Sequence, residues 1–113
     1  MKAVFVELPS FNKYRSDYLV DDEYQSLQRS LLESPSMGDV IQGTGGLRKI
    51  RWVDKNRNKG KRGGIRIIYY WYDGGSQFWF FTIFDKNEAS DITPDQKKIL
   101  KKMLEAELAS RKE

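Results

Sequence analysis

Two strongly apolar runs joined by a short turn constrain the fold of this chain more than any other feature. The runs at 65–72 and 77–84, IRIIYYWY and QFWFFTIF, are rich in β-branched and aromatic residues, which favour strands. The residues between them at 73–76 are DGGS, and glycine and aspartate are typical of tight reversals. The sequence therefore predicts an antiparallel hairpin.

Five further elements are predicted from the spacing of apolar residues. The last helix has the clearest start, because Thr93, Pro94 and Gln96 match an N-cap, a first-turn proline and a capping-box partner. A second helix is expected to take its N-cap and acidic first turn from the acids at 21–23 and to end before Pro35. The five elements are strands at 2–8 and 47–53 and helices at 11–18, 21–34 and 93–108. The buried stripe expected on the last helix is Ile99, Leu100, Met103, Leu104 and Leu108.

The resulting order, β-α-α-β-β-β-α, predicts one small α+β domain over residues 1–113 with an antiparallel-type sheet. A chain of 113 residues is long enough to bury a single core. We expect the helices to cover one face of this sheet and to leave the other face open. Alternation along 47–53 places Lys49 and Arg51 together, and Arg66 from the following strand can project on the same open face.

The positive charge of the chain is confined to its middle third. Residues 41–72 carry nine basic side chains and one acidic side chain, whereas the segments on either side each have a small negative balance. Such a local field favours a polyanion, and because basic residues also stand on the strands, nucleic acid is the favoured partner. The alternative is that the basic loop at 54–64 is only a solvated turn. Candidate RNA-binding residues here are Arg48, Lys59, Lys61 and Arg62.

The absence of cysteine and histidine removes whole classes of chemistry. Disulfides, thiolate zinc sites, cysteine nucleophiles and serine–histidine triads are excluded. The basic region also lacks a cluster of carboxylates, so we expect no metal, no cofactor and no metal-dependent phosphodiester cleavage. No apolar run is long enough to span a bilayer and none resembles a signal peptide, which predicts a cytoplasmic protein without membrane contact.

A register that pairs Arg51 with Arg66 would place like charges directly opposite, which destabilises a sheet. A phosphate held between the two guanidinium groups would turn that repulsion into bidentate contacts. RNA supplies its own nucleophile, the 2′-hydroxyl, so a protein only has to align the attack and stabilise the charge on phosphate. Lys49, flanked by cations, is the candidate general base, and Lys86 is the candidate acid.

Three segments carry a resemblance to a known family. GDVIQGTGGLRKIR at 38–51, KRGGIRIIYYWY at 61–72 and TIFDKNE at 82–88 resemble the HigB-type toxins of the RelE/ParE superfamily. The resemblance implies the toxin of a type II toxin–antitoxin system, a RelE-like fold, and an endoribonuclease (mRNA interferase) that cleaves mRNA in the ribosomal A site without metal. It also implies a cognate HigA-type helix-turn-helix antitoxin, with operator DNA bound only through the toxin–antitoxin complex.

The resemblance also assigns residues. It places catalytic roles on Lys49, Arg51, Arg66 and Lys86. Two positions depart from the RelE pattern, because Asn87 replaces an arginine and Thr93 falls near the position of a catalytic tyrosine. Tyr70 or Tyr72 would then provide stacking, unless both belong to the core, and Asn87 is counted among the RNA-binding candidates. Two other functions remain open: a ParE-like toxin that inhibits gyrase, and a non-catalytic RNA-binding module.

Overall fold

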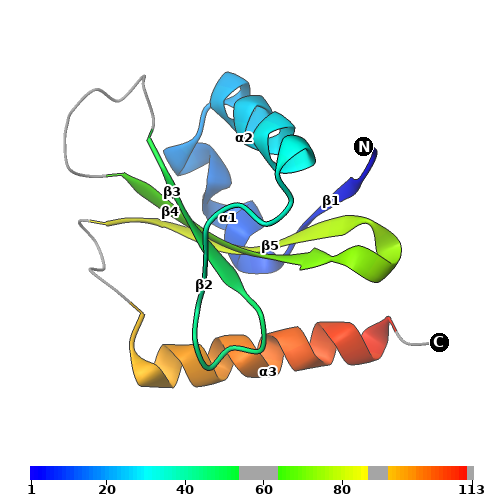
Figure 1. Cartoon of the computed structure of the whole chain (residues 1–113). Coiled ribbons are helices and arrows are strands. Elements are labelled where there is room, and N and C mark those ends of the chain that lie inside the picture. The colour runs from blue at the N-terminus through cyan, green and yellow to red at the C-terminus, as the bar shows by residue number, and fades with distance from the viewer. Residues whose placement is uncertain (54–63, 87–91, 112–113) are drawn as a thin grey trace.

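The predicted hairpin is formed by β4 (Ile65–Tyr72) and β5 (Gln77–Asp85), and it lies at the middle of a sheet ordered β1-β5-β4-β3-β2 (Figure 1). The computed structural model describes residues 1–53, 64–86 and 92–111. A short 3-10 turn, Asp73–Gly75, joins the two hairpin strands. The other elements are β1 (Val4–Glu7), α1 (Pro9–Tyr18), α2 (Asp21–Glu33), β2 (Asp39–Val40), β3 (Arg48–Trp52) and α3 (Pro94–Ser110).

The α+β class and the order of the predicted elements are confirmed, with one strand added. That strand is β2, a two-residue strand that pairs antiparallel with the start of β3. β3, β4 and β5 are antiparallel to one another, as expected, whereas β1 runs parallel to β5 at the opposite edge. The sheet is therefore mixed, because β1 pairs with the last strand, β5, and not with the strand that follows it in the chain.

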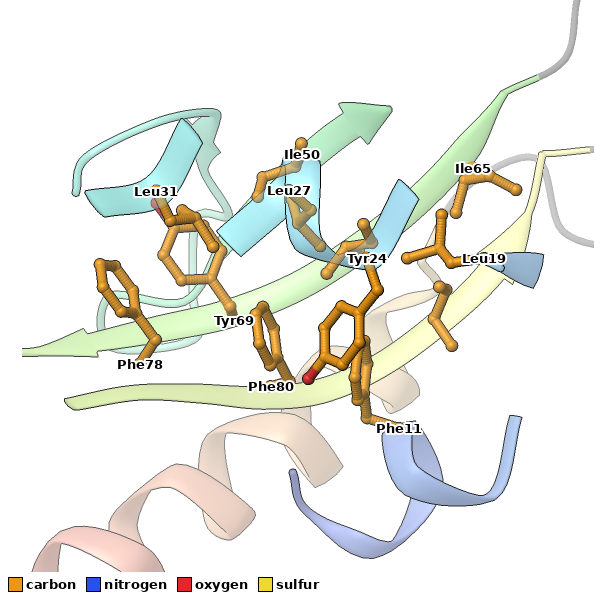
Figure 2. Close-up of a cluster of buried hydrophobic side chains, with 12 residues drawn as sticks. Phe11, Leu19, Tyr24, Leu27, Leu31, Ile50, Ile65, Tyr69, Phe78 and Phe80 are labelled. Atoms are coloured by element: carbon orange, nitrogen blue, oxygen red, sulfur yellow. The ribbon is translucent and has the colours of Figure 1, made fainter. Parts of the chain in front are cut away.

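The helices are divided between the two faces of the sheet, which differs from the expectation of one covered face. α1 and α2 pack on the first face, where Phe11 and Leu27 contact a core that includes Phe80 (Figure 2). α3 packs on the second face, where Leu100 and Leu104 join a separate core. The sheet residues of that second core include Ile68, Trp79 and Phe81. Because β4 and β5 are apolar on both sides, both sides of the sheet have to be covered.

The start of α3 follows its prediction closely. Thr93 Oγ1 accepts a hydrogen bond from the backbone N–H of Gln96 at 3.1 Å, and Gln96 Oε1 accepts one from the backbone N–H of Thr93 at 2.9 Å. Leu100 and Leu104 are buried as expected, but Ile99 is 59% exposed and is not part of the buried stripe. Ile99 lies on the same side of the helix as Met103, four residues later, which is itself only partly buried, so this side of α3 is at the margin of the core.

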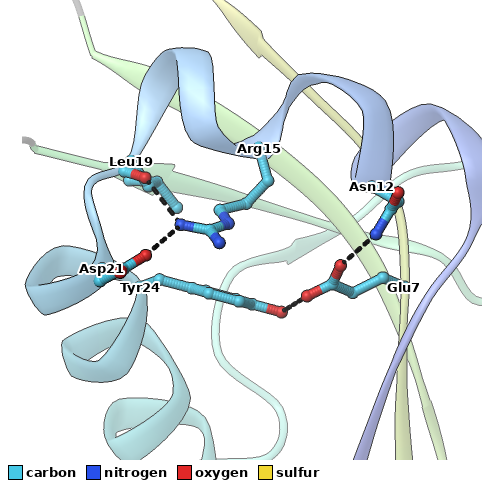
Figure 3. A network of polar contacts seen from close by, with 6 residues as sticks. All are labelled: Glu7, Asn12, Arg15, Leu19, Asp21 and Tyr24. Atoms are coloured by element: carbon cyan, nitrogen blue, oxygen red, sulfur yellow. Dashed lines mark hydrogen bonds and ion pairs between the residues drawn. The ribbon is translucent and has the colours of Figure 1, made fainter.

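The start of α2 differs from its prediction. Its N-cap is Val20, without a side-chain hydrogen bond, and Asp21 is the first helical residue. The acids of the first turn still interact favourably with the helix dipole, and Arg15 holds Asp21 by an ion pair of 3.0 Å. Glu7 then connects the first strand to both helices, because it accepts hydrogen bonds from Tyr24 Oη at 2.6 Å and from Asn12 Nδ2 at 2.8 Å (Figure 3).

The connection before β3, residues 38–47, is rich in glycine and packs toward α3. Its residues Ile41 and Leu47 are buried in the second core, and the hydroxyl of Thr44 donates to the carbonyl of Ile41 at 2.7 Å. At its start, Gly38 has a φ of +91°, and a Cβ at that position would lie 2.5 Å from the carbonyl oxygen of Lys49. Only glycine allows this close approach, which holds the loop against the first residues of β3.

Candidate functional site

Three basic residues lie on the sheet face that α3 partly covers. Arg51 and Arg66 are direct partners in the antiparallel register of β3 and β4, which confirms the pairing considered from the sequence. Lys49, two residues before Arg51, has Ile68 of the second core as its partner, so alternation places all three basic residues on that face. Directly opposite residues have Cβ atoms about 5 Å apart. We call Lys49, Arg51 and Arg66 the cationic cluster.

The two arginines differ in their surroundings. Arg51 is exposed, whereas Arg66 is partly buried. Burial lowers the pKa of Arg66 below its ordinary value, and the positive charge of Arg51 lowers it further, while the carboxylate of Asp85 opposes both effects. Arginine stays protonated in proteins, so the result is a partly desolvated positive charge beside a like charge. An anion placed between these guanidinium groups would be strongly favoured.

A backbone hydrogen bond to Gly64 holds Lys86 at the end of the sheet where Arg66 lies. The backbone N–H of Lys86 donates to the carbonyl of Gly64 at 3.1 Å, just beyond the last residue of β5. Gly64 in turn lies against the guanidinium of Arg66, because a Cβ at Gly64 would be 3.0 Å from Arg66 Nη1. Lys86 is exposed, and its backbone lies at the end of the sheet where Arg66 stands.

Arg48 is not part of this cluster. It alternates with Lys49 and therefore lies on the opposite face of β3. Its guanidinium donates to the carbonyls of Ser36 at 2.8 Å and Gly38 at 3.1 Å, so it binds the chain that leaves α2. The structure thus gives Arg48 a structural role, and its predicted contact with RNA has no support from its position.

Tyr70 and Tyr72 lie on the same face as Arg66 but further along β4. Their rings pack on the buried Trp79, with centroid separations of 5.4 Å for Tyr70 and 4.8 Å for Tyr72. They are four and six residues from Arg66, which corresponds to roughly 13 and 20 Å along a strand. Both rings are partly buried in the second core, so the structure favours the packing interpretation over base stacking at the cluster.

The remaining residues of interest have structural roles or lie outside the described residues. Thr93 is the N-cap of α3 and is used in its capping box, which gives this departure from the RelE pattern a structural explanation. Sequence reasoning missed Asp85, which directly precedes Lys86; it pairs with Ile65 of the first face, is almost buried, and its carboxylate still acts electrostatically on Arg66. The predicted RNA-binding residues that lie outside the described residues are Lys59, Lys61, Arg62 and Asn87.

In the described part of the chain, residues 1–53, 64–86 and 92–111, no three acidic or other metal-ligating side chains gather in a way that would hold a metal ion. None of the helices in this part combines the length and apolar character needed to cross a bilayer.

Comparisons with known proteins identify the fold. No protein-family model matches the chain. The chain is similar to the solved structure of E. coli toxin RelE, a double arginine-to-alanine mutant in the free state. The two share 17% sequence identity with a TM-score of 0.52, and the match covers 80% of this chain and 90% of that one. The chain therefore has a RelE-like fold.

Proposed function

We propose that this protein is the toxin of a type II toxin–antitoxin system and acts as a ribosome-dependent endoribonuclease on translated mRNA. The observation that carries the proposal is the direct pairing of Arg51 with Arg66, beside Lys49, on one sheet face. The two arginines have Cβ atoms about 5 Å apart, so both guanidinium groups can bind the oxygens of one phosphate. The RelE-like fold adds support, because it is the fold of a toxin.

The proposed reaction needs no metal. The 2′-oxygen of one ribonucleotide forms a bond to the adjacent phosphorus, and the bond from phosphorus to the 5′-oxygen of the next nucleotide breaks. The proton of the 2′-hydroxyl passes to a base, and the leaving 5′-oxygen receives a proton from an acid, which leaves a 2′,3′-cyclic phosphate. Arg51 and Arg66 stabilise the additional negative charge on phosphate in the transition state.

Lysines on either side of the arginines are suited to the proton transfers. Lys49 lies on the same face as the two arginines and is assigned the role of base. Lys86 is exposed at the end of β5, on the other side of Arg66, and is assigned the role of acid. Under this assignment the attacking oxygen would lie near β3 and the leaving oxygen near the end of β5.

The proposed partners follow from the same assignment. The substrate is mRNA in the ribosomal A site, where the ribosome aligns the RNA for in-line attack. A HigA-type helix-turn-helix antitoxin encoded with the toxin neutralises it, and operator DNA is bound only by the complex. The basic residues outside the described residues, Lys59, Lys61 and Arg62, together with Asn87, remain predicted RNA contacts.

Induced expression with mapping of mRNA 5′ ends tests this proposal. We expect the wild-type chain to arrest translation and to produce cuts at in-frame positions, which disappear when the message carries no start codon. Arg66→Ala and Arg51→Ala should both abolish the cuts. Arg29→Ala is the matched control, because Arg29 is exposed on α2, on the opposite face, and should leave cleavage unchanged.

Three other results would contradict the proposal. Continued translation with a rising DNA-damage response would replace it with a gyrase-inhibiting toxin. Salt-sensitive RNA binding without cleaved mRNA would identify a non-catalytic RNA-binding module. Full cleavage by both arginine variants, at protein levels equal to wild type, would remove the cationic cluster from the mechanism.

A further inference from the structure

An apolar groove lies between the sheet and the first half of α3, on the same face as the cationic cluster. Its volume is about 340 Å³. The groove is lined by residues of α1, β4, β5 and α3, together with Ile92 just before α3. These residues are Ser10, Ile68, Phe81, Thr82, Phe84, Ile92, Gln96, Ile99, Leu100 and Met103.

The groove combines an apolar floor with a few polar groups at its edge. Ile68, Phe81 and Leu100 are buried beneath it. The hydroxyls of Ser10 and Thr82 lie 2.9 Å apart in a mutual hydrogen bond, with capacity for another partner. Gln96 uses its carbonyl oxygen in the capping box, so its amide group remains a donor. A concave, mostly apolar surface with a few hydrogen-bonding groups is the character of a small-molecule site.

The groove is continuous with the cationic cluster through the register of the sheet. Phe84, which lines the groove, is the direct partner of Arg66 across β4 and β5. Ile68, also in its lining, is the direct partner of Lys49 across β3 and β4. Neighbouring strands are about 4.8 Å apart, so the wall of the groove begins one strand away from the cluster.

We propose that this groove is a nucleobase subsite, which holds the base of a ribonucleotide whose phosphate is bound by the cationic cluster. The inference rests on the proposed function and adds the place where a base is held. A phosphate and the base of its own nucleotide are separated by one ribose, a spacing comparable to that of adjacent strands. The cationic cluster favours an RNA occupant over an uncharged apolar segment.

The lining suits a single base. Phe84, which is only partly buried, offers aromatic surface for stacking, a contact that every base can make, and the buried Phe81 supports the floor beneath it. Discrimination between bases would come from Gln96, Ser10 and Thr82, which can hydrogen-bond a base edge. The exposure of Ile99, 59% on an otherwise amphipathic helix, is accounted for as the open rim of this subsite.

Filling the groove tests the proposal. The variant Ile99→Trp adds an indole at the rim, and Ala106→Trp adds the same group to an exposed position of α3 that does not line the groove. The probes are fluorescein-labelled hexaribonucleotides, either intact or with one abasic nucleotide placed at each position in turn. Affinity is read by fluorescence anisotropy, and thermal unfolding checks that each variant is folded.

In wild type, loss of the base at one position should weaken binding about tenfold, since base–aromatic stacking is typically worth this much. Ile99→Trp should weaken binding of the intact probe to a similar extent, and the abasic nucleotide at that position should then cause no further loss. Ala106→Trp should behave as wild type. Gln96→Glu preserves the capping box but replaces an amide donor with an acceptor, and it should change which base is preferred at that position.

Three results would overturn the subsite. One is an abasic effect in Ile99→Trp as large as that in wild type, and another is an unchanged base preference in Gln96→Glu. The third is normal RNA binding by Ile99→Trp with lost binding of the co-encoded antitoxin, which would make the groove a protein docking site. Failure of the proposed function looks different, because Arg51→Ala and Arg66→Ala would then bind every probe like wild type.

Discussion

Arg51 and Arg66 lie directly opposite each other in the register of β3 and β4, and Arg66 is partly withdrawn from solvent. Burial and the charge of Arg51 both lower the pKa of Arg66, so each of these effects opposes its positive charge. Asp85 compensates in part. This arrangement costs the fold some stability, and it is the arrangement that a phosphate between the two strands would relieve.

Replacing Arg51 should therefore stabilise the protein while it removes activity. Arg51→Gln is expected to raise the free energy of unfolding by a few tenths to about 1 kcal/mol, because it removes a like-charge pair. Inorganic phosphate should stabilise wild type more than this variant. Both quantities can be measured by urea unfolding at low ionic strength.

Arg48→Gln is the control for this measurement. It should lower the free energy of unfolding by about 1 kcal/mol, since Arg48 donates to the carbonyls of Ser36 and Gly38. Two arginines three positions apart on one strand are thus expected to act in opposite directions. A loss of stability in Arg51→Gln would show that the pair is not repulsive in the folded protein.

Tyr69 should make the protein sensitive to alkaline pH. Burial raises the pKa of Tyr69 to about 12, although the charge of Arg48 lowers it in part. The folded state then keeps a proton that the unfolded state loses near pH 10. Stability from this group is complete below pH 10 and falls as pH rises toward 12, by up to roughly 3 kcal/mol.

Tyr69→Phe should make that dependence shallower in urea unfolding measured between pH 9 and 12, while Tyr24, whose pKa is raised by burial and by Glu7, keeps part of it. Its stability at neutral pH should be lower than that of wild type, because the Tyr69 hydroxyl donates to the carbonyls of Pro35 and Met37 at 2.8 and 2.7 Å. Tyr14→Phe, at a position that is 40% exposed, should keep the wild-type slope. An identical slope in Tyr69→Phe would assign the alkaline transition to another group.

The hydrogen bond between Tyr24 and Glu7 should be a main support of the first sheet face. At 2.6 Å it joins a nearly buried hydroxyl to a carboxylate, and it connects β1 to α2. Tyr24→Phe is expected to cost about 1.5–3 kcal/mol in urea unfolding, the range for hydrogen bonds to charged groups. Glu7→Gln, which keeps an acceptor, should cost less, and the reverse order would contradict this assignment.

Local signals in the sequence predicted the fold well where the structure depends on neighbours in the chain. The hairpin strands and the capping box of α3 match their predictions, because turn residues and cap residues act over a few positions. The placement of α3 on the second sheet face was not predicted, although the unbroken apolar character of β4 and β5 is typical of strands buried on both sides. The parallel pairing of β1 depends on contacts far apart in sequence and has no local signal.

The candidate site shows the same division. Alternation predicted that Lys49 and Arg51 share a face, and the register then placed Arg66 opposite Arg51. Alternation also places Arg48 on the other face. Its hydrogen bonds to two loop carbonyls, however, depend on how the chain leaves α2. The packing of Tyr70 and Tyr72 on Trp79 likewise depends on cross-strand neighbours that periodicity does not specify.

Gly38 and Gly43 have similar φ angles but should respond differently to substitution by alanine. Gly38 has a φ of +91° and Gly43 a φ of +83°, so alanine is strained at both positions, by about 1–2 kcal/mol. Only at Gly38 would the new Cβ also meet backbone, 2.5 Å from the carbonyl oxygen of Lys49, whereas nothing lies within 4 Å of it at Gly43. Neither of the two backbone segments can move without disrupting the pairing of β2 with β3.

We therefore expect Gly43→Ala to lose about 1–2 kcal/mol in urea unfolding and to keep the function of the cationic cluster. Gly38→Ala should lose clearly more, and it should also weaken RNA binding at a temperature where it is folded, because relief of the contact displaces Lys49. Equal losses of stability in the two variants would mean that the loop adjusts without moving β3. Equal RNA affinity would mean that the position of Lys49 is fixed by β4 instead of by the glycine loop.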